Sequence, residues 1–143
     1  GDGFYYGDGP VLPSFAFAFM HASVNFNLDA AYGSNRVTIN QAQLSVVNGV
    51  AGTTYSQMLT FSDTSTAATF QLFPTEGAGT PIDYQLFFGS DPIPKGTPFQ
   101  WQNLNPGMNT KDLKVGGIVE SSVADKVSGT YSDTITVTIT NPN

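Results

Sequence analysis

Apolar and polar residues alternate along residues 14–30 in a pattern that is typical of an extended strand. All even positions in this segment are apolar, namely Ala16, Ala18, Met20, Ala22, Val24, Phe26, Leu28 and Ala30. The odd positions are polar from His21 to Asp29 and are phenylalanine before His21. This alternation predicts a strand with one buried face after residue 20, and a strand covered on both faces before it.

The length of this predicted strand sets it apart. At ~3.3 Å per residue, residues 14–30 would extend over roughly 55 Å, whereas an ordinary strand has about five or six residues. Such a strand can fold back as the first strand of its own domain. It can also insert into the open edge of a neighbouring copy, where backbone hydrogen bonds supply affinity and side-chain pockets set the register. The length favours insertion, because the strand can then bridge two molecules, and a head-to-tail contact that does not close builds a filament.

The middle of the chain predicts short strands that are separated by turns. The expected strands cover residues 36–47, 55–61, 67–73, 84–88, 99–102 and 113–119. Turn-forming residues such as Asn48-Gly49 lie between them. About seven strands with this spacing predict an all-β fold, a Greek-key sandwich.

The closing segment, residues 129–140, has the cleanest alternation in the chain. The apolar side chains at its odd positions are Tyr131, Ile135, Val137 and Ile139. Threonine occupies every even position from 134 to 140. This pattern predicts a strand with one face on the core and one face in solvent.

These patterns divide the chain into three parts. Residues 1–13 form a glycine-rich extension, residues 14–30 form the long strand, and residues 31–143 form the sandwich domain. The aromatic side chains near the start of the extension are Phe4, Tyr5 and Tyr6. Because the extension has no core of its own and aromatic residues are enriched at interfaces, we expect these three at a contact between subunits.

The composition excludes several classes of function. Only 11 % of the residues are charged, against about 25 % in an average domain, and the net charge is −6. Without a basic patch, we expect no nucleic-acid partner. The chain contains no apolar run of about 18 residues, so we expect no transmembrane segment. The absence of cysteine excludes disulfides, a thiolate nucleophile and cysteine-based metal sites.

Few of the remaining residues could carry chemistry. His21, the only histidine, lies on the polar side of its strand, so an ordinary surface histidine is favoured over a pH-sensitive switch. Asp2 and Asp8 lack the ligand spacing of a calcium loop. We interpret them as solvated turn residues and expect neither a bound metal nor a cofactor.

Two other groups of residues were candidates for catalysis or for ligand binding. Asp112, Asp125 and Asp133 could lie near one end of the sandwich, but the sequence gives no pairing of the kind that a glycosidase needs. Trp101 and Phe99 could stack against a sugar, although a place in the core is the commoner role for such residues. The sequence therefore favours a structural or binding protein over an enzyme.

The two ends of the chain resemble pilin subunits of the chaperone–usher class. The run GTYSDTITVTI at 129–139 is similar to the last strand of these pilins, and SVNFNLD at 23–29 is similar to their N-terminal donor strand. The resemblance is greatest to the archaic, spore-coat-protein-U-like branch and to the capsular-antigen-type fibre subunits.

This resemblance implies an immunoglobulin-like sandwich that lacks one strand, which the donor strand of a neighbouring subunit supplies. Val24, Phe26 and Leu28 match the donor positions. The residues that extend the same register are Ala18, Met20 and Ala22. The residues that match the core face of the acceptor's final strand are Tyr131, Ile135, Val137 and Ile139. The resemblance thus assigns 14–30 as a donor strand that inserts in a neighbouring subunit.

A near alternative is the camelysin/TasA-like group of biofilm fibre proteins. Archaic-type pilins usually carry a disulfide near the start of the core, where this chain has Tyr32-Gly33 and no cysteine. Camelysin/TasA-like proteins also donate N-terminal strands and can lack cysteine.

Either resemblance implies a structural subunit of an extracellular, cell-surface pilus or fibre that serves adhesion or biofilm formation. Its main partner would be further copies of itself, in a head-to-tail homopolymer. In the chaperone–usher case, a periplasmic chaperone and an outer-membrane usher would be further partners. Other hypotheses are a monomeric or tip-located adhesin that binds carbohydrate, and a capsid, tail or surface-layer domain whose N-terminal arm is swapped.

Overall fold

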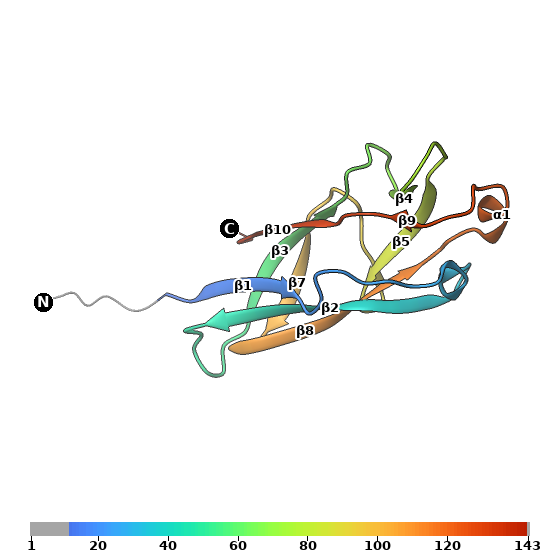
Figure 1. Cartoon of the computed structure of the whole chain (residues 1–143). Coiled ribbons are helices and arrows are strands. Elements are labelled where there is room, and N and C mark those ends of the chain that lie inside the picture. The colour runs from blue at the N-terminus through green and yellow to red at the C-terminus, as the bar shows by residue number, and fades with distance from the viewer. Residues whose placement is uncertain (1–11, 143) are drawn as a thin grey trace, which may run out of the picture.

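The computed structural model describes residues 12–142 as two antiparallel β-sheets that pack face to face. Figure 1 shows the elongated sandwich that they form. The predicted contact residues Phe4, Tyr5 and Tyr6, and most of the predicted 1–13 extension, lie outside the described residues.

The larger sheet has seven strands. Six of them follow the order β1 (Ser14–Phe19), β2 (Arg36–Val47), β8 (Gly107–Gly116), β5 (Ile82–Phe88), β4 (Phe70–Pro74) and β9 (Tyr131–Ser132). The seventh, β6 (Asp91–Pro92), pairs with β5. The smaller sheet has the order β10 (Thr136–Thr140), β3 (Tyr55–Ser62) and β7 (Phe99–Leu104). Two short helices complete the described chain, a 3-10 helix η1 (Leu28–Ala31) and α1 (Glu120–Val123).

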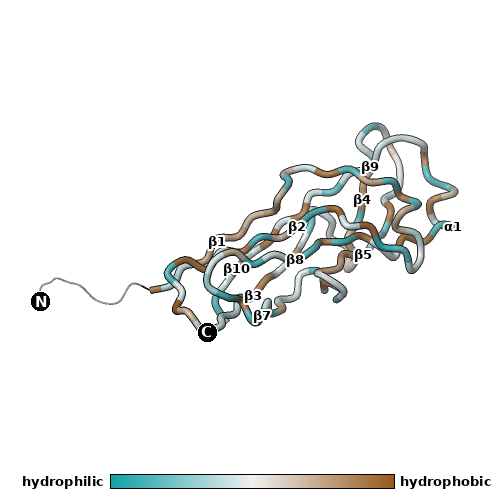
Figure 2. The backbone as a smooth tube through the Cα atoms, turned by 90° about the horizontal axis from the view of Figure 1, so that it is seen from below, coloured by the Kyte–Doolittle hydropathy of each residue, from teal (hydrophilic) through white to brown (hydrophobic). Residues whose placement is uncertain are grey.

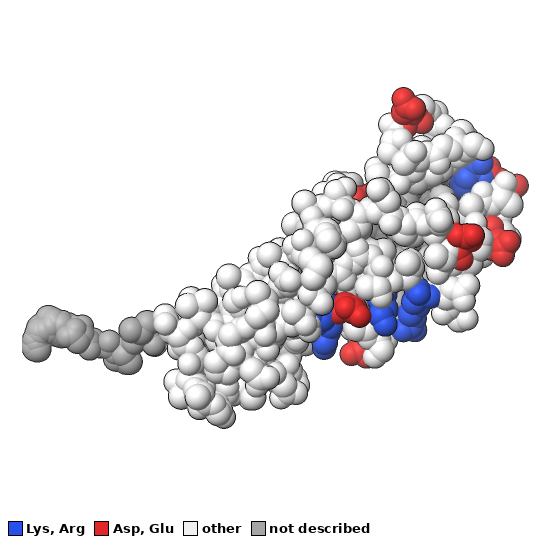
Figure 3. Space-filling view, turned by 60° about the horizontal axis from the view of Figure 1, so that its bottom comes forward, with Lys and Arg blue, Asp and Glu red and all other residues white. Residues whose placement is uncertain are grey.

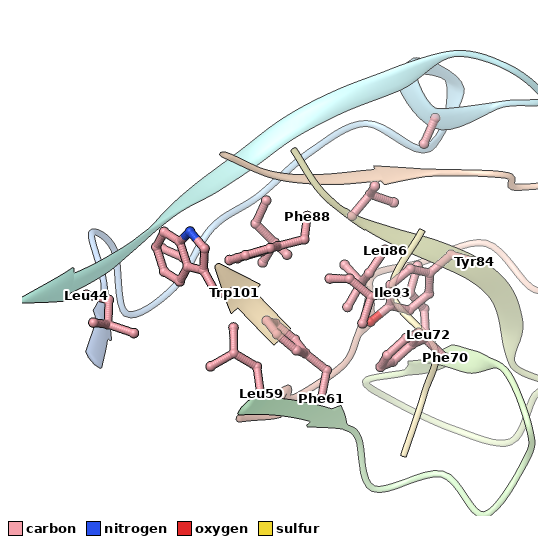
Figure 4. Close-up of a cluster of buried hydrophobic side chains, with 14 of the residues drawn as sticks. Leu44, Leu59, Phe61, Phe70, Leu72, Tyr84, Leu86, Phe88, Ile93 and Trp101 are labelled. Carbon is pink, nitrogen blue, oxygen red and sulfur yellow. The ribbon is translucent and has the colours of Figure 1, made fainter. Parts of the chain in front are cut away.

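The hydrophobic core lies between the two sheets and is rich in aromatic rings. Figure 4 shows Phe61 and Trp101 from the smaller sheet facing Phe88 from the larger one. The rings of Phe88 and Trp101 meet edge to face, with centroids 4.9 Å apart, a favoured aromatic geometry. The exposed fraction of Trp101 is only 5 %. Its role is therefore to fill the core.

The strands carry their hydrophobic residues on the faces that meet the core. In Figure 2 hydrophobic and hydrophilic segments alternate along several strands. In β10 the threonines are exposed, whereas Val137 and Ile139 are half-buried. This is the pattern of strands that cover a core on one side only. The predicted all-β sandwich is confirmed, with ten strands in place of about seven.

The expected long strand at 14–30 is interrupted in this structure. Its first part forms β1, which pairs with β2 up to Phe19. The Asn40 side chain then forms hydrogen bonds with both backbone groups of His21. It accepts from the His21 N–H at 3.0 Å and donates to the His21 carbonyl at 2.8 Å. The side chain replaces the next step of the β-ladder, so the chain leaves the sheet there. In the described chain, η1 is the only helix or strand between β1 and β2.

The closing segment is likewise divided into β9 and β10. β9 pairs with β4 in the larger sheet, whereas β10 pairs with β3 in the smaller sheet. Residues 133–135 carry the chain between them. The predicted parity holds throughout, because the odd positions from 131 to 139 all face inward.

Candidate functional site

A groove opens on one side of the sandwich, between two extended segments of the chain. One wall is formed by residues 21–29 and the other by residues 129–135. Its volume is about 1070 Å3. The buried side chains at its floor come from the larger sheet and are Leu72, Tyr84, Leu86, Leu113 and Val115.

The first wall of the groove is attached to the rest of the molecule mainly through side-chain packing, and less through backbone hydrogen bonds. We call residues 20–27, which join β1 to η1, the arm. Val24 and Phe26 of the arm are half-buried, and Phe26 packs against the core. Among the described residues, the backbone of 22–26 makes no hydrogen bond. The arm thus lies over the core as an extended segment outside either sheet.

The apolar face of 14–30 changes parity within the segment. In β1 the odd-numbered Phe15, Phe17 and Phe19 face the core, whereas Ala18 is exposed. Met20 has an exposed fraction of 49 %, and Ala22 is exposed as well. From there on the even-numbered residues face inward, since Val24, Phe26 and Leu28 are half-buried. The six predicted donor residues therefore lie on two different sides of the chain in this structure. Their insertion in a neighbouring subunit stays a prediction.

The second wall leads into a strand with a free edge. Tyr131, Ile135, Val137 and Ile139 are half-buried and pack against the core. Within the described residues β10 pairs with β3 alone, so the backbone groups on its other edge have no strand partner. β1 is the terminal strand of the larger sheet on the same side. A smaller hollow of about 660 Å3 lies between the two, lined by residues 13–15 and 139–141.

Four ionisable side chains meet beside the groove, where the chain crosses between the sheets. The Lys95 ammonium lies 2.5 Å from a carboxylate oxygen of Asp63. The Asp63 side chain is fully buried, and that of Lys95 is 9 % exposed. Asp63 also shares a hydrogen bond with Asp133, which lines the groove and accepts a second one from the Tyr84 hydroxyl. We call these four residues the acid pair cluster.

Lys95 ties the loop between β3 and β4 to this cluster. Its ammonium donates to the backbone carbonyls of Ser65, Ala67 and Thr69 at 2.8 to 3.0 Å. The Asp63 carboxylate accepts from the backbone N–H of Gln71 at 2.9 Å. A buried charge with several such partners is stabilised as an ion.

The two carboxyl groups of the cluster have opposite pKa shifts. Burial, followed by the hydrogen bond with Asp63, raises the pKa of Asp133 to about 7. Burial alone would also raise the pKa of Asp63. However, the hydrogen bonds from Asp133 and Lys95 and that from the Gln71 backbone outweigh burial, so this pKa falls below its ordinary value. Below about pH 7 the pair therefore holds one proton, and Asp133 carries it.

Sequence reasoning named Asp133 but missed Asp63, Lys95 and Tyr84. A signal for Asp133 was present, because it occupies an odd, core-facing position between Tyr131 and Ile135. No comparable periodicity marks Asp63 or Lys95, which lie in loops. Neither Asp112 nor Asp125 belongs to the acid pair cluster.

The other candidate residues have ordinary surroundings. His21 is exposed, and its backbone is held by Asn40. Phe99 stacks against Phe61, with ring centroids 5.8 Å apart. Within residues 12–142, no three His, Cys, Asp or Glu side chains come together as a metal site would require. None of the helices in the described part of the chain has the length and hydrophobicity needed to span a bilayer.

Comparison with known proteins shows a likeness of fold. No protein-family model and no curated protein sequence matches this chain. Among solved structures, the fold is similar to that of a chain in a chaperone–tip adhesin complex of CFA/I fimbriae biogenesis, with a TM-score of 0.54 and 14 % sequence identity. The match covers 89 % of this chain and 42 % of that chain. At this identity the likeness shows a shared fold.

Proposed function

We propose that this protein is a structural subunit of an extracellular pilus or fibre, and that its copies join by donor-strand complementation. The observation that carries the proposal is the groove. One of its walls is an arm without backbone hydrogen bonds among the described residues, and the other leads into the free edge of β10. An inserted strand would complete the smaller sheet beside β10.

An exchange of strands between copies replaces contacts within one chain by contacts between two chains. Fully burying an apolar side chain is worth about 1.5–3 kcal/mol. Val24, Phe26 and Leu28 are already half-buried in their own chain, so moving them into a neighbour gains only part of this. The larger gain comes from the backbone, because each hydrogen bond made to β10 contributes about 0.5–1.5 kcal/mol. Several such bonds would offset the β1–β2 ladder that the segment 14–30 gives up when it leaves its own sheet.

The proposed donor is the segment 14–30, and the acceptor is the final strand. The donor side chains are those at Ala18, Met20, Ala22, Val24, Phe26 and Leu28. The acceptor side chains are those at Tyr131, Ile135, Val137 and Ile139. Because β1 lies N-terminal to the arm, donation of 14–30 also withdraws Phe15, Phe17 and Phe19 from their own core and breaks the pairing of β1 with β2.

The fimbrial fold likeness supports a place for this protein on the cell surface. The similar chain belongs to a complex of a chaperone and a tip adhesin. By analogy, we propose a periplasmic chaperone and an outer-membrane usher as assembly partners. We propose no enzymatic activity and no cofactor. Adhesion or biofilm formation is the proposed role of the fibre.

A tip-located or monomeric adhesin is the second candidate, because the similar structure also contains a tip adhesin. Trp101 would not provide the sugar-binding surface in that case, since it is buried against Phe88. A carbohydrate site would have to use other residues.

The test compares two pairs of substitutions within the arm. Val24→Asp with Phe26→Asp places charges on the inward face, whereas Asn25→Asp with Asn27→Asp places the same charges on exposed positions. By electron microscopy, we expect filaments from the natural chain and from the exposed pair, and none from the inward pair. Circular dichroism checks that each variant folds.

A synthetic peptide of residues 14–30 tests the proposal even if the inward pair unfolds. Added in excess to the natural chain, it should occupy the grooves and stop filament growth. A natural chain that remains monomeric at all concentrations would refute the fibre. Filaments that form equally well with the inward pair would refute the arm as the donor.

A further inference from the structure

The chain bends between β1 and the arm, and this bend changes which side chains face the core. In an extended strand, successive side chains point to opposite faces, so odd and even positions do not share a face. β1 nevertheless packs the odd-numbered Phe19 against the core, whereas the arm packs the even-numbered Phe26 against it. Bends within residues 20–23 produce this change of face.

The side chain of Asn40, in β2, holds the bend in place. It accepts a hydrogen bond from the His21 N–H at 3.0 Å and donates one to the His21 carbonyl at 2.8 Å. Its oxygen also accepts from the N–H of Gln41 at 2.9 Å, which fixes the orientation of the Asn40 amide. Within the described chain, the two bonds to His21 are the only hydrogen bonds made by residues 21–26.

The arm has no Asp, Glu, Lys or Arg side chain that could tie it to the rest of the molecule. The same is true of β1, and Figure 3 shows no charged side chain on the visible face of the half that adjoins the N-terminal trace. The arm is therefore attached through its half-buried side chains and through the two bonds from Asn40 to His21.

A donated strand with a single inward face cannot keep this bend. The six proposed donor side chains occupy even positions from Ala18 to Leu28, so they share one face only when the segment is straight. A straight strand forms its hydrogen bonds with the backbone of a neighbouring strand, which is β10 in the proposed assembly. Straightening residues 20–23 breaks the bonds from Asn40 to His21, so these bonds belong to the arm before donation.

We propose that Asn40 is a clasp that holds the arm in its own chain and must release His21 before the arm is donated. The inference rests on the proposed function and names a residue that opposes assembly. Two hydrogen bonds of ordinary strength correspond to about a tenfold change in the equilibrium between a held and a released arm. Because a copy can donate only a released arm, the clasp lowers the rate of strand exchange by a similar factor.

Asn109 provides a matched control, because its side chain makes the same pair of bonds elsewhere in the molecule. It accepts from the Asn105 N–H and donates to the Asn105 carbonyl, both at 2.9 Å. Asn40 and Asn109 are both half-buried. Asn109→Ala therefore removes a similar set of bonds, none of which involves the arm.

A single thiol in the arm measures its release in the monomer, because the natural chain has no cysteine. Val24→Cys places this thiol at a half-buried position. Its rate of reaction with a chromogenic disulfide reagent is measured alone, with Asn40→Ala and with Asn109→Ala. We expect Asn40→Ala to raise the rate about tenfold and Asn109→Ala to leave it unchanged. Equal rates in all three chains would overturn the inference.

Asn40→Asp keeps the test decisive if circular dichroism shows that Asn40→Ala does not fold. An aspartate retains the acceptor for the His21 N–H but loses the donor to the His21 carbonyl, so a smaller rise in the reaction rate is expected. A rate no higher than that of the Val24→Cys chain alone would again count against the clasp.

Seeded filament growth, followed by light scattering, tests the link to assembly. Chains with Asn40→Ala should grow about tenfold faster than the natural chain, and chains with Asn109→Ala at the natural rate. Removal of a residue that merely stabilised the fold would not speed growth. Growth of Asn40→Ala chains at or below the natural rate would overturn the inference, while the filaments themselves would leave the proposed function intact. If no chain forms filaments the proposed function fails, and the thiol reaction rates still decide whether Asn40 holds the arm.

Discussion

The Tyr84 hydroxyl donates a hydrogen bond of 2.5 Å to the carboxyl group of Asp133, at the point where the closing segment passes from one sheet to the other. Asp63, bonded to Asp133, begins the part of the chain that crosses in the opposite direction, from β3 to β4. The acid pair cluster thus links the segment between β9 and β10 to the segment between β3 and β4 beside the groove. We expect the stability of the groove wall to depend on this cluster.

The first prediction concerns pH. The pKa of Asp133 is about 7 in the folded chain and near 3.8 when unfolded. For a carboxyl group whose pKa is raised, the stabilising contribution is complete below the unfolded pKa and disappears as pH rises through the folded one. Stability should therefore fall between about pH 4 and pH 7. With allowance for solvent screening, a loss of order 1 kcal/mol and a fall in Tm of about 3–6 °C are expected.

Differential scanning calorimetry measures this effect. Asp133→Asn imitates the protonated carboxyl group, so its Tm should hardly change over the same pH range. Asp125→Asn, at an exposed position, should keep the natural pH dependence. A natural chain whose Tm is constant from pH 4 to pH 7 would contradict the protonated state that we assign to Asp133.

The second prediction concerns Lys95. Lys95→Met removes the cation from a fully buried carboxylate and releases three backbone carbonyls. Removing one partner of a buried ion pair costs about 3–5 kcal/mol. Urea denaturation should show a loss of this size. Lys126→Met, which loses an exposed hydrogen bond to Thr80, should cost less than about 1 kcal/mol. Equal effects of the two substitutions would show that Lys95 is no more than a surface lysine.

Strands were predictable from the sequence where the alternation of apolar and polar residues coincides with pairing in a sheet. Residues 36–47 and the inward face of 131–139 were predicted correctly, because period-two alternation reports which side meets the core. The end of β1 could not be predicted from alternation. It depends on the Asn40 side chain, which forms hydrogen bonds with the backbone N–H and carbonyl of His21.

The site was predictable only in part, for a related reason. Alternation drew attention to Val24, Phe26 and Leu28, which are the half-buried residues of the groove wall and its continuation in η1. The acid pair cluster depends on contacts between residues far apart in the chain, such as Asp63 with Lys95. No local pattern encodes such contacts. Asp133 at a core-facing position was the one local indication.

Hydrogen exchange on the single chain and on the assembled fibre tests donor-strand complementation most directly. The amides of residues 22–26 have no acceptor among the described residues, so they should exchange rapidly in the monomer. In the fibre, alternate amides of the arm and of the free edge of β10 should be protected together, by about a hundredfold or more. Arm amides that exchange equally fast in monomer and fibre would contradict the account.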